Sequence, residues 1–306
     1  MAYQQTNATS VENLVNAIAA FAVSAGWTQR RNDLTGTNRT VTLQKGGDNI
    51  HLYNTDTSNI GLAASVGYDA GLGPRAQPNQ SLYNARCNVG TGPFANVFMF
   101  AGDSPAEHVH VVIEVASGEF RMLSFGLLEK FGTYTGGTFF DASYINSSFI
   151  ANAADSRHHR LFDNGTQTSS QVATGGTGGV RCDVDGNTNC FCPFADGSLA
   201  TIPMASGGFI SENPWTGGDG GYRNSQFFAK SVNSFGGVTP VAPVLIRVER
   251  PDNYWSDIGH VPGIRFLNMA KFASGDEFSL GPDTFKVFPW TSKTYYNYAF
   301  AFLKTA

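Results

Sequence analysis

The hydrophobic pattern of this chain changes period once, near Gly26, and that change constrains the fold more than any other feature. Before it, apolar residues recur every three or four positions from Val11 to Ala25, which places them on one face of an α-helix. Thr9 and Glu12 have the spacing of a capping box, and Gly26 stands where a helix C-cap is expected. The pattern therefore predicts one amphipathic helix near the N-terminus.

After Gly26 the apolar residues alternate with polar ones, which is typical of β-strands. Val41 and Leu43 alternate before Gly46-Gly47, and Ile50 and Leu52 alternate after it, so this stretch is expected to form a hairpin. Residues 69–95 are rich in Gly, Pro and Asn and are expected to form a long loop. Further strands are expected at 60–68, 97–101, 109–116, 120–124, 244–248, 263–269, 277–280 and 284–288, and around Tyr296, Tyr298, Phe300 and Phe302.

These elements predict an α+β fold that is mostly antiparallel β, with the helix packed on a β-sheet or sandwich core. Residues 150–240 are dominated by Gly, Ser, Thr and Asn and show little periodicity, so they are interpreted as a loop-rich insertion. We therefore expect residues 1–149 to form the helix and a first β part. Residues 241–306 are expected to complete the same core after the insertion.

The composition excludes several classes of protein. A hydrophobic fraction of 42% and a formal net charge of −4 exclude intrinsic disorder. A net negative charge does not attract phosphate groups, so nucleic acid is not an expected partner. No run of 18 apolar residues is present, which predicts no transmembrane helix. The polar N-terminus lacks the pattern of a signal peptide, so we expect the chain to be made and first kept in a cytoplasm.

Familiar catalytic signatures are missing from the sequence. There is no nucleophile elbow, no P-loop, no dinucleotide-binding glycine motif and no H-E-x-x-H zinc motif. We therefore expect a protein that is not an enzyme.

Two histidines form a candidate metal site. His108 and His110 are two residues apart in a predicted strand, so their side chains are expected on one face. Three chains around an axis can supply six imidazole nitrogens to one metal ion, such as iron. The alternative is that both histidines lie on the solvent face while Val109 and Val111 face the core.

The cysteines offer a second candidate metal site. Cys182, Cys190 and Cys192 are close in sequence, and Cys87 is available from another segment. Four thiolates can hold zinc or an iron–sulfur cluster. A disulfide between Cys87 and one of the other three, or free thiols in a reducing cytoplasm, are the alternatives.

The loop-rich insertion contains several aromatic side chains, which one subunit has difficulty burying. Aromatic residues supply large contact areas and are enriched at protein interfaces. We therefore expect an assembly surface made by Phe191, Phe194, Phe209, Trp215, Tyr222, Phe227 and Phe228.

Three stretches of the chain resemble virion structural proteins of tailed bacteriophages, of the kind found in tails and baseplates. They are the helix ending in Gly26-Trp27, the segment 107–137 that contains the His-Val-His-Val run, and the segment 263–290. The resemblance covers about half of the chain. It implies a building block present in many symmetric copies, often on three-fold or six-fold rings, that binds copies of itself and other tail or baseplate proteins. It also implies assembly in the bacterial host cytoplasm and a final place in the virion.

Some phage tail spikes use a His-x-His pair to hold iron at a three-fold tip, whereas here the pair lies in mid-chain. Two other functions remain open from the sequence. One is a carbohydrate-binding or receptor-binding β module that uses Trp215, Tyr222 and Trp255, whose rings can stack on a sugar. The other is a neck or head–tail connector component.

Overall fold

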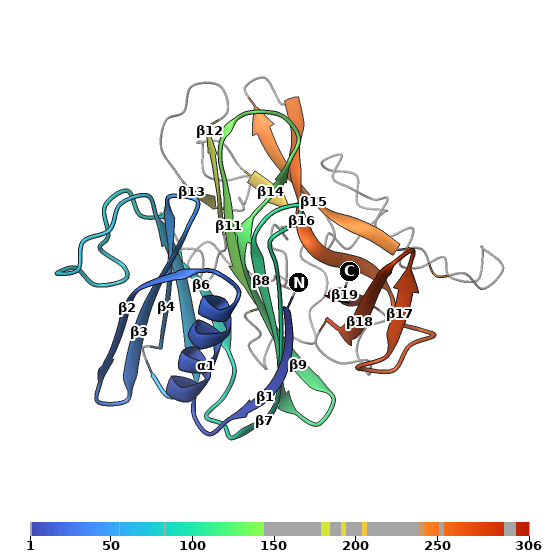
Figure 1. Cartoon of the computed structure of the whole chain (residues 1–306), viewed down its shortest axis with the longest axis horizontal. Coiled ribbons are helices and arrows are strands. Elements are labelled where there is room, and N and C mark those ends of the chain that lie inside the picture. The colour runs from blue at the N-terminus through green and yellow to red at the C-terminus, as the bar shows by residue number, and fades with distance from the viewer. Residues whose placement is uncertain are drawn as a thin grey trace, which may run out of the picture.

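The computed structural model describes residues 2–54, 56–81, 84–143, 179–183, 191–193, 204–206, 239, 241–250, 254–290 and 298–305. These residues form three antiparallel β-sheets and a single α-helix near the N-terminus (Figure 1). The structure thus confirms the predicted fold class, which is mostly antiparallel β with an N-terminal helix and a long insertion. The helix is too short to cross a membrane, and no other helix is present in the described ranges.

Sheet A runs through the middle of the molecule. Its strands, in spatial order, are β1 (Ala2–Ala8), β7 (Phe94–Gly102), β8 (His108–Ala116), β9 (Glu119–Leu127), β11 (Thr135–Ala142), β12 (Gly179–Asp183) and β13 (Phe191–Pro193).

Sheets B and C lie on opposite sides of sheet A. Sheet B has the order β2 (Thr28–Thr35), β3 (Asn38–Lys45), β4 (Asp48–Asn54), β5 (Asn59–Ser65) and β6 (Ala85–Asn88). Sheet C has the order β14 (Met204–Ser206), β15 (Val241–Arg250), β16 (Tyr254–Asn268), β19 (Tyr298–Thr305), β18 (Asp283–Pro289) and β17 (Glu277–Leu280), and the short β10 (Glu129–Lys130) pairs with β16.

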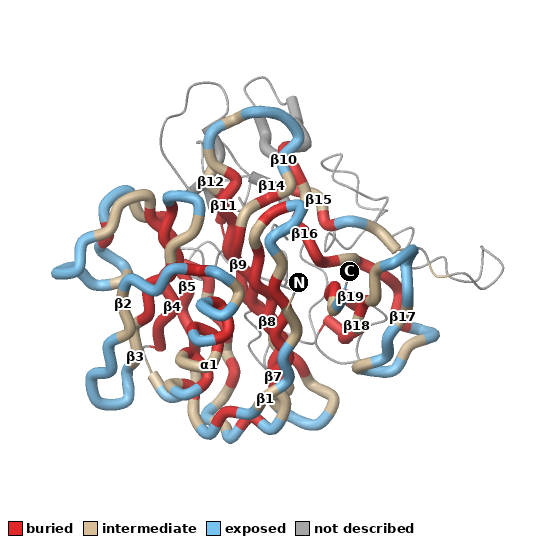
Figure 2. The backbone as a smooth tube through the Cα atoms, viewed as in Figure 1, coloured by how far each residue is buried: buried red, intermediate tan, exposed pale blue. Residues whose placement is uncertain are grey.

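Both faces of sheet A are buried, as the red strands at the centre of Figure 2 show. On β7, Val97 and Met99 belong to the core shared with sheet B and the helix. The alternate residues Phe98 and Phe100 belong to a second core shared with sheet C. Successive side chains of a strand point to opposite faces, so a strand buried on both faces reads as a nearly continuous apolar run.

Helix α1 (Val11–Ser24) packs on β3 and β4 of sheet B and reaches β1 and β7 of sheet A. Its N-cap is Ser10, whose hydroxyl accepts a hydrogen bond from the Asn13 backbone N–H at 3.1 Å. The predicted cap at Thr9 is therefore wrong by one residue. Gly26 follows the helix end with φ +88°, and the Trp27 N–H bonds to Ala22 O, as in a Schellman motif.

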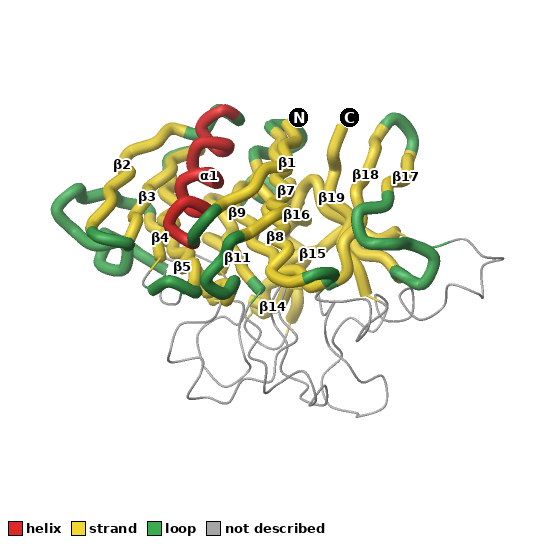
Figure 3. The backbone as a smooth tube through the Cα atoms, turned by 90° about the horizontal axis from the view of Figure 1, so that it is seen from below, coloured by secondary structure: helices red, strands yellow, loops and turns green. Residues whose placement is uncertain are grey.

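The insertion contributes strands to both packed sheets, although its sequence predicted only loops. β12 and β13 extend sheet A beyond β11, and β14 lies at one edge of sheet C. The opposite edges of these sheets are β1 and β17. Figure 3 shows α1, β1, β17 and both chain ends along one side of the molecule and β14 toward the other.

Candidate functional site: buried histidines that join strands and layers

The side chains of His108 and His110 lie together in the core between sheets A and C. Their relative exposures are only 1% and 0%, and their ring centroids are 4.8 Å apart. The prediction that the two residues share a face of β8 is confirmed. The alternative of a solvent-exposed face is wrong, because sheet C covers that face of sheet A.

His110 links the two sheets through both ring nitrogens. Nε2 lies 2.8 Å from the carbonyl oxygen of Pro262 on β16, and Nδ1 lies 2.7 Å from Oγ of Ser124 on β9. A carbonyl oxygen can only accept, so Nε2–H donates to Pro262. Because burial lowers the pKa of His110 and keeps the ring neutral, Nδ1 carries no proton and accepts from the Ser124 hydroxyl. The imidazole therefore connects the two layers.

His108 has one nitrogen bonded and one facing a glycine. Nδ1 lies 2.8 Å from the Ala106 carbonyl oxygen and must donate to it, which leaves a lone pair on Nε2. Nε2 is buried without a hydrogen-bond partner. A Cβ added at Gly263 would lie 2.2 Å from Nε2 and 3.0 Å from each neighbouring ring carbon, which is along the lone-pair direction. The Cα–H group of Gly263 therefore fills the position in front of this nitrogen.

Burial keeps both imidazoles neutral. It lowers the pKa of His108 to about 4 and lowers the pKa of His110 well below the usual histidine value, with His108 adding to the second shift. Neutral imidazoles can ligate metals, but a bond to nitrogen needs about 2.0–2.1 Å of free space, which Gly263 occupies. Among the described side chains, no group of three or more His, Cys, Asp or Glu is arranged around a common point. The geometry therefore gives no support to a metal at this pair.

Cys87 lies in the other core, between sheets B and A. It is a free thiol that is fully buried, and its Sγ is 3.8 Å from Met122 O and 4.0 Å from Ser143 Oγ. Burial raises the pKa of the Cys87 thiol to about 12, so the group is protonated and unreactive. The disulfide alternative therefore does not hold for Cys87.

The other cysteines are only partly within the described structure. Cys182 on β12 pairs with Gly136, and Cys192 on β13 pairs with Val180. Gly136 is seven residues from Ser143, which is roughly 20 Å along an extended strand. Cys87 and Cys182 are therefore not brought together, whereas Cys190 lies outside the described residues.

The predicted aromatic assembly surface falls almost wholly outside the described residues. The backbone of Phe191 is placed on β13, opposite Arg181. The positions outside the described residues are Phe194, Phe209, Trp215, Tyr222, Phe227 and Phe228. The assembly surface stays a prediction. Of the proposed sugar-stacking residues, Trp255 is placed on β16, opposite Glu249.

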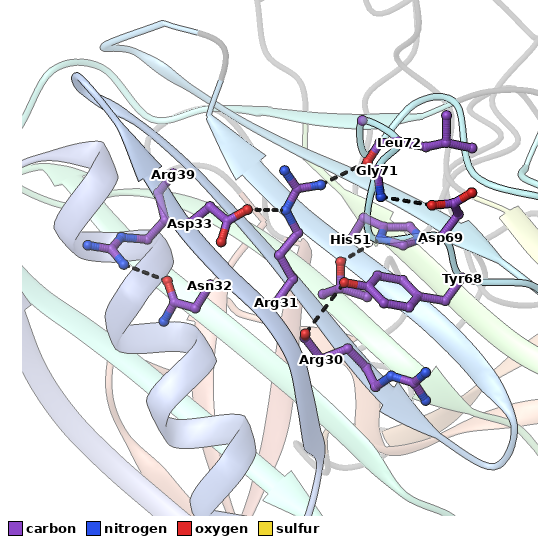
Figure 4. Close-up of polar contacts among 12 residues, drawn as sticks. Arg30, Arg31, Asn32, Asp33, Arg39, His51, Tyr68, Asp69, Gly71 and Leu72 are labelled. Carbon is purple, nitrogen blue, oxygen red and sulfur yellow. Dashed lines mark hydrogen bonds and ion pairs between the residues drawn. The ribbon is translucent and has the colours of Figure 1, made fainter.

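A third buried histidine, which the sequence analysis missed, lies on the outer face of sheet B (Figure 4). His51 Nε2 is 2.8 Å from Ser65 Oγ, and its Nδ1 is 3.0 Å from Thr42 Oγ1. Ser65 donates its own proton to Gly67 O at 2.6 Å, so it must accept from His51 Nε2–H. His51 therefore cannot act as a base toward Ser65, and the three side chains join adjacent strands.

The segment 66–81 folds back over sheet B on the side of His51 (Figure 4). The Gln77 side chain organises it, because Oε1 accepts from the Asp69 N–H while Nε2 donates to carbonyl oxygens of Asp69 and Leu72. Arg31 on β2 holds it from the edge, donating to Leu72 O at 2.8 Å (Figure 4). Burial, with a smaller contribution from Arg31, lowers the pKa of His51 to about 4. A Gly- and Pro-rich composition predicted a loop here but could not show which surface the loop covers.

A buried ionic cluster attaches the insertion to the N-terminal part of the chain. Asp48, at the start of β4, pairs with Arg181 of β12 at 2.5 Å and accepts the Thr138 hydroxyl of β11 at 2.5 Å. The Asp48 side chain is 4% exposed and that of Arg181 is 22% exposed. The cluster joins sheet B to the insertion's edge of sheet A.

At His110, at His51 and at Asp48, polar side chains of the described structure connect strands and layers of the core. The comparisons with known proteins give no family to set beside this geometry. No protein-family model matches the chain, and no curated protein matches it.

Proposed function

We propose that this chain is a structural component of a tailed-bacteriophage virion, in the tail or baseplate. It assembles in symmetric copies and binds neighbouring virion proteins. It is built in the host cytoplasm and ends in the particle. The alternative is a neck or head–tail connector component, which would also be structural but would lie at another place in the particle.

One observation carries the proposal most directly. The three stretches that resemble tail and baseplate proteins coincide with the stacked layers: α1, the run from β8 to β11, and β16 to β18. The resemblance therefore concerns the packed scaffold rather than isolated turns.

The use of polar side chains agrees with a scaffold role. His110 bonds across two sheets, His51 across three strands, and Asp48 across sheets B and A. Buried polar networks that are satisfied hold layers in one relative position, which suits a part that transmits force within an assembly.

The test is the location of the protein in the particle. Phage particles purified on a density gradient should contain the chain at a fixed stoichiometry by quantitative mass spectrometry, and cryo-EM should place its three-sheet core in the tail, baseplate or neck. A capsid protein from the same particles is the positive control, and a host cytoplasmic protein is the negative control. Presence of the chain in the infected lysate but not in washed particles would refute the proposal.

A further inference from the structure

We propose that the bulge of β16 at Pro262 and Gly263 is an acid-sensitive contact between sheets C and A. When Nε2 of His108 takes up a proton from solvent, the bulge moves away from β8 and water enters between the two strands. No other covalent bond changes in this step. This conformational response does not depend on the proposed function.

Pro262 and Gly263 interrupt the pairing of β16 along both of its edges. On the side of β15, the register passes from Val261 directly to Arg265. On the other side, pairing with β10 ends before the bulge and pairing with β19 begins after it. A bulge without partners in the ladder is displaced at a lower cost than a paired strand.

Two contacts from β8 hold the bulge in place. His110 Nε2–H donates to the carbonyl oxygen of Pro262 at 2.8 Å, and the His108 ring faces Gly263. Figures 1 and 3 both place β16 beside β8. The position of the bulge therefore depends on the protonation of these two rings.

His108 fits this place only as a neutral ring. Its Nδ1–H already donates to Ala106 O, so a proton on Nε2 would form a second N–H group, directed at the backbone of Gly263. Nε2 has no hydrogen-bond partner, and a buried donor or charge without a partner is costly. Movement of the bulge lets water accept from the new N–H group and hydrate the charge.

The described strands packed against the two rings present no charged group to them. The neighbours of the rings on these strands are Phe100 and Gly102 of β7, Ser124 and Gly126 of β9, and Phe302 of β19. The next carboxyl group across sheet A from His110 is Asp141, opposite Ser124 and one strand further away. A protonated His108 would therefore have no counter-ion in direct contact.

The pKa of His108 agrees with this geometry. Burial is the largest influence and lowers the pKa to about 4, with the amino terminus acting in the same direction. The Ala106 carbonyl, Asp103 and Glu107 act in the opposite direction. Because the exposed ring has its ordinary pKa of about 6.5, acid favours the open contact, and its opening constant should rise about 50-fold from pH 7 to pH 4.5.

Hydrogen exchange of the full chain, read by mass spectrometry, tests the proposal. The protection of residues 258–268, corrected for the intrinsic effect of pH on exchange, should fall about 50-fold from pH 7 to pH 4.5 in the wild type, while α1 stays protected. In His108→Met, which has no titrating ring, the protection should stay constant. The matched control is His51→Gln, which removes another buried histidine with a pKa of about 4 and should keep the wild-type fall.

A second measurement uses the wild type alone and therefore does not require a variant to fold. In NMR spectra recorded as a function of pH, the amide signal of Gly263 should shift with the same midpoint as the imidazole signals of His108. The amide signals of α1, which packs in the other core, should not follow that midpoint.

The proposal is overturned if residues 258–268 keep their protection in acid, if His108→Met loses protection as the wild type does, or if His51→Gln abolishes the effect. It is also overturned if the Gly263 amide does not follow the titration of His108. These outcomes leave the virion function standing, because that function is tested separately by the presence of the protein in particles.

Discussion

At the scale of single residues, the buried histidines decide how the layers meet. Both ring nitrogens of His110 form hydrogen bonds, one to each of two sheets. The Nε2 atom of His108 has no hydrogen-bond partner and lies against the backbone of Gly263. The close approach is possible because residue 263 has no side chain. Gly263 also has φ +67°, a conformation that other residues adopt at a cost. The contact between the sheets therefore depends on this glycine.

The first prediction concerns Gly263→Ala. The added methyl would meet Nε2 at 2.2 Å, so the substitution should destabilise the fold by about 2–5 kcal/mol from strain and overpacking together. Gly118→Ala is the control, since φ there is +74° but nothing lies within 4 Å of an added Cβ. It should cost about 1–2 kcal/mol. Urea unfolding measures both, and equal losses would contradict the proposed contact.

The second prediction concerns pH. The pKa values of His51 and His108 are about 4 in the folded chain and about 6.5 in the unfolded chain. Between these values the unfolded chain binds protons that the folded chain does not. Stability from this source is therefore complete above pH 6.5 and is lost as pH falls toward 4. From pH 7 to pH 5 each of the two residues should cost about 2 kcal/mol.

Urea unfolding at the two pH values checks this expectation. His51→Gln is the informative variant, because an amide can still donate to Ser65 and accept from Thr42 without titrating. The loss of stability between pH 7 and pH 5 should therefore be smaller in this variant than in the wild type, by the contribution of His51. A variant whose pH dependence equals that of the wild type would show that His51 does not contribute.

At the scale of elements, the sequence pattern correctly predicted the helix and the hairpins, which depend on interactions between residues close together in the chain. The helix, the β3–β4 hairpin around Gly46-Gly47 and the β17–β18 hairpin are all present, because period and turn residues act over a few positions. β1, β2, β6 and β11 were missed, since none of them carries an alternating apolar run long enough to be recognised, and their pairing is set by neighbouring strands of the sheets. The solvent-face alternative for His108 and His110 on β8 is wrong for a similar reason. His-Val-His-Val reads as an amphipathic strand, but β16, some 150 residues later in the chain, covers the histidines.

The third prediction tests the start of α1. Ser10→Ala removes the side chain that caps the Asn13 N–H and should cost about 1 kcal/mol. Thr9→Ala removes only the side-chain bond from Asn13 Nδ2, which is exposed, and should cost less. Thermal unfolding ranks the two variants. If Thr9→Ala lost more stability than Ser10→Ala, the N-cap would be Thr9, as the sequence spacing predicted.

At the scale of the whole molecule, a few long-range polar contacts hold distant parts of the chain in register. The candidate site could be predicted only in part, because His108 and His110 are two residues apart, whereas Pro262, which accepts from His110, lies 152 residues later in the chain. The same holds for Asp48 and Arg181, which are 133 residues apart in the chain. No periodicity or spacing in the sequence relates such residues. Their pairing follows from the stacking of sheets.

The fourth prediction concerns this Asp48–Arg181 pair. A double-mutant cycle with Asp48→Asn and Arg181→Gln should give a coupling energy of about 1–3 kcal/mol. Asp48 is almost fully buried, so removing one partner leaves the other charge without its ion pair. Asp56 and Arg86 form the control pair at 3.1 Å, with both side chains 40% exposed. Their coupling should stay below about 1 kcal/mol, because solvent screens exposed ion pairs. Urea unfolding of seven proteins, the wild type and three variants for each cycle, gives both values. Equal coupling in the two cycles would mean that the insertion is held to sheet B by contacts other than this ion pair.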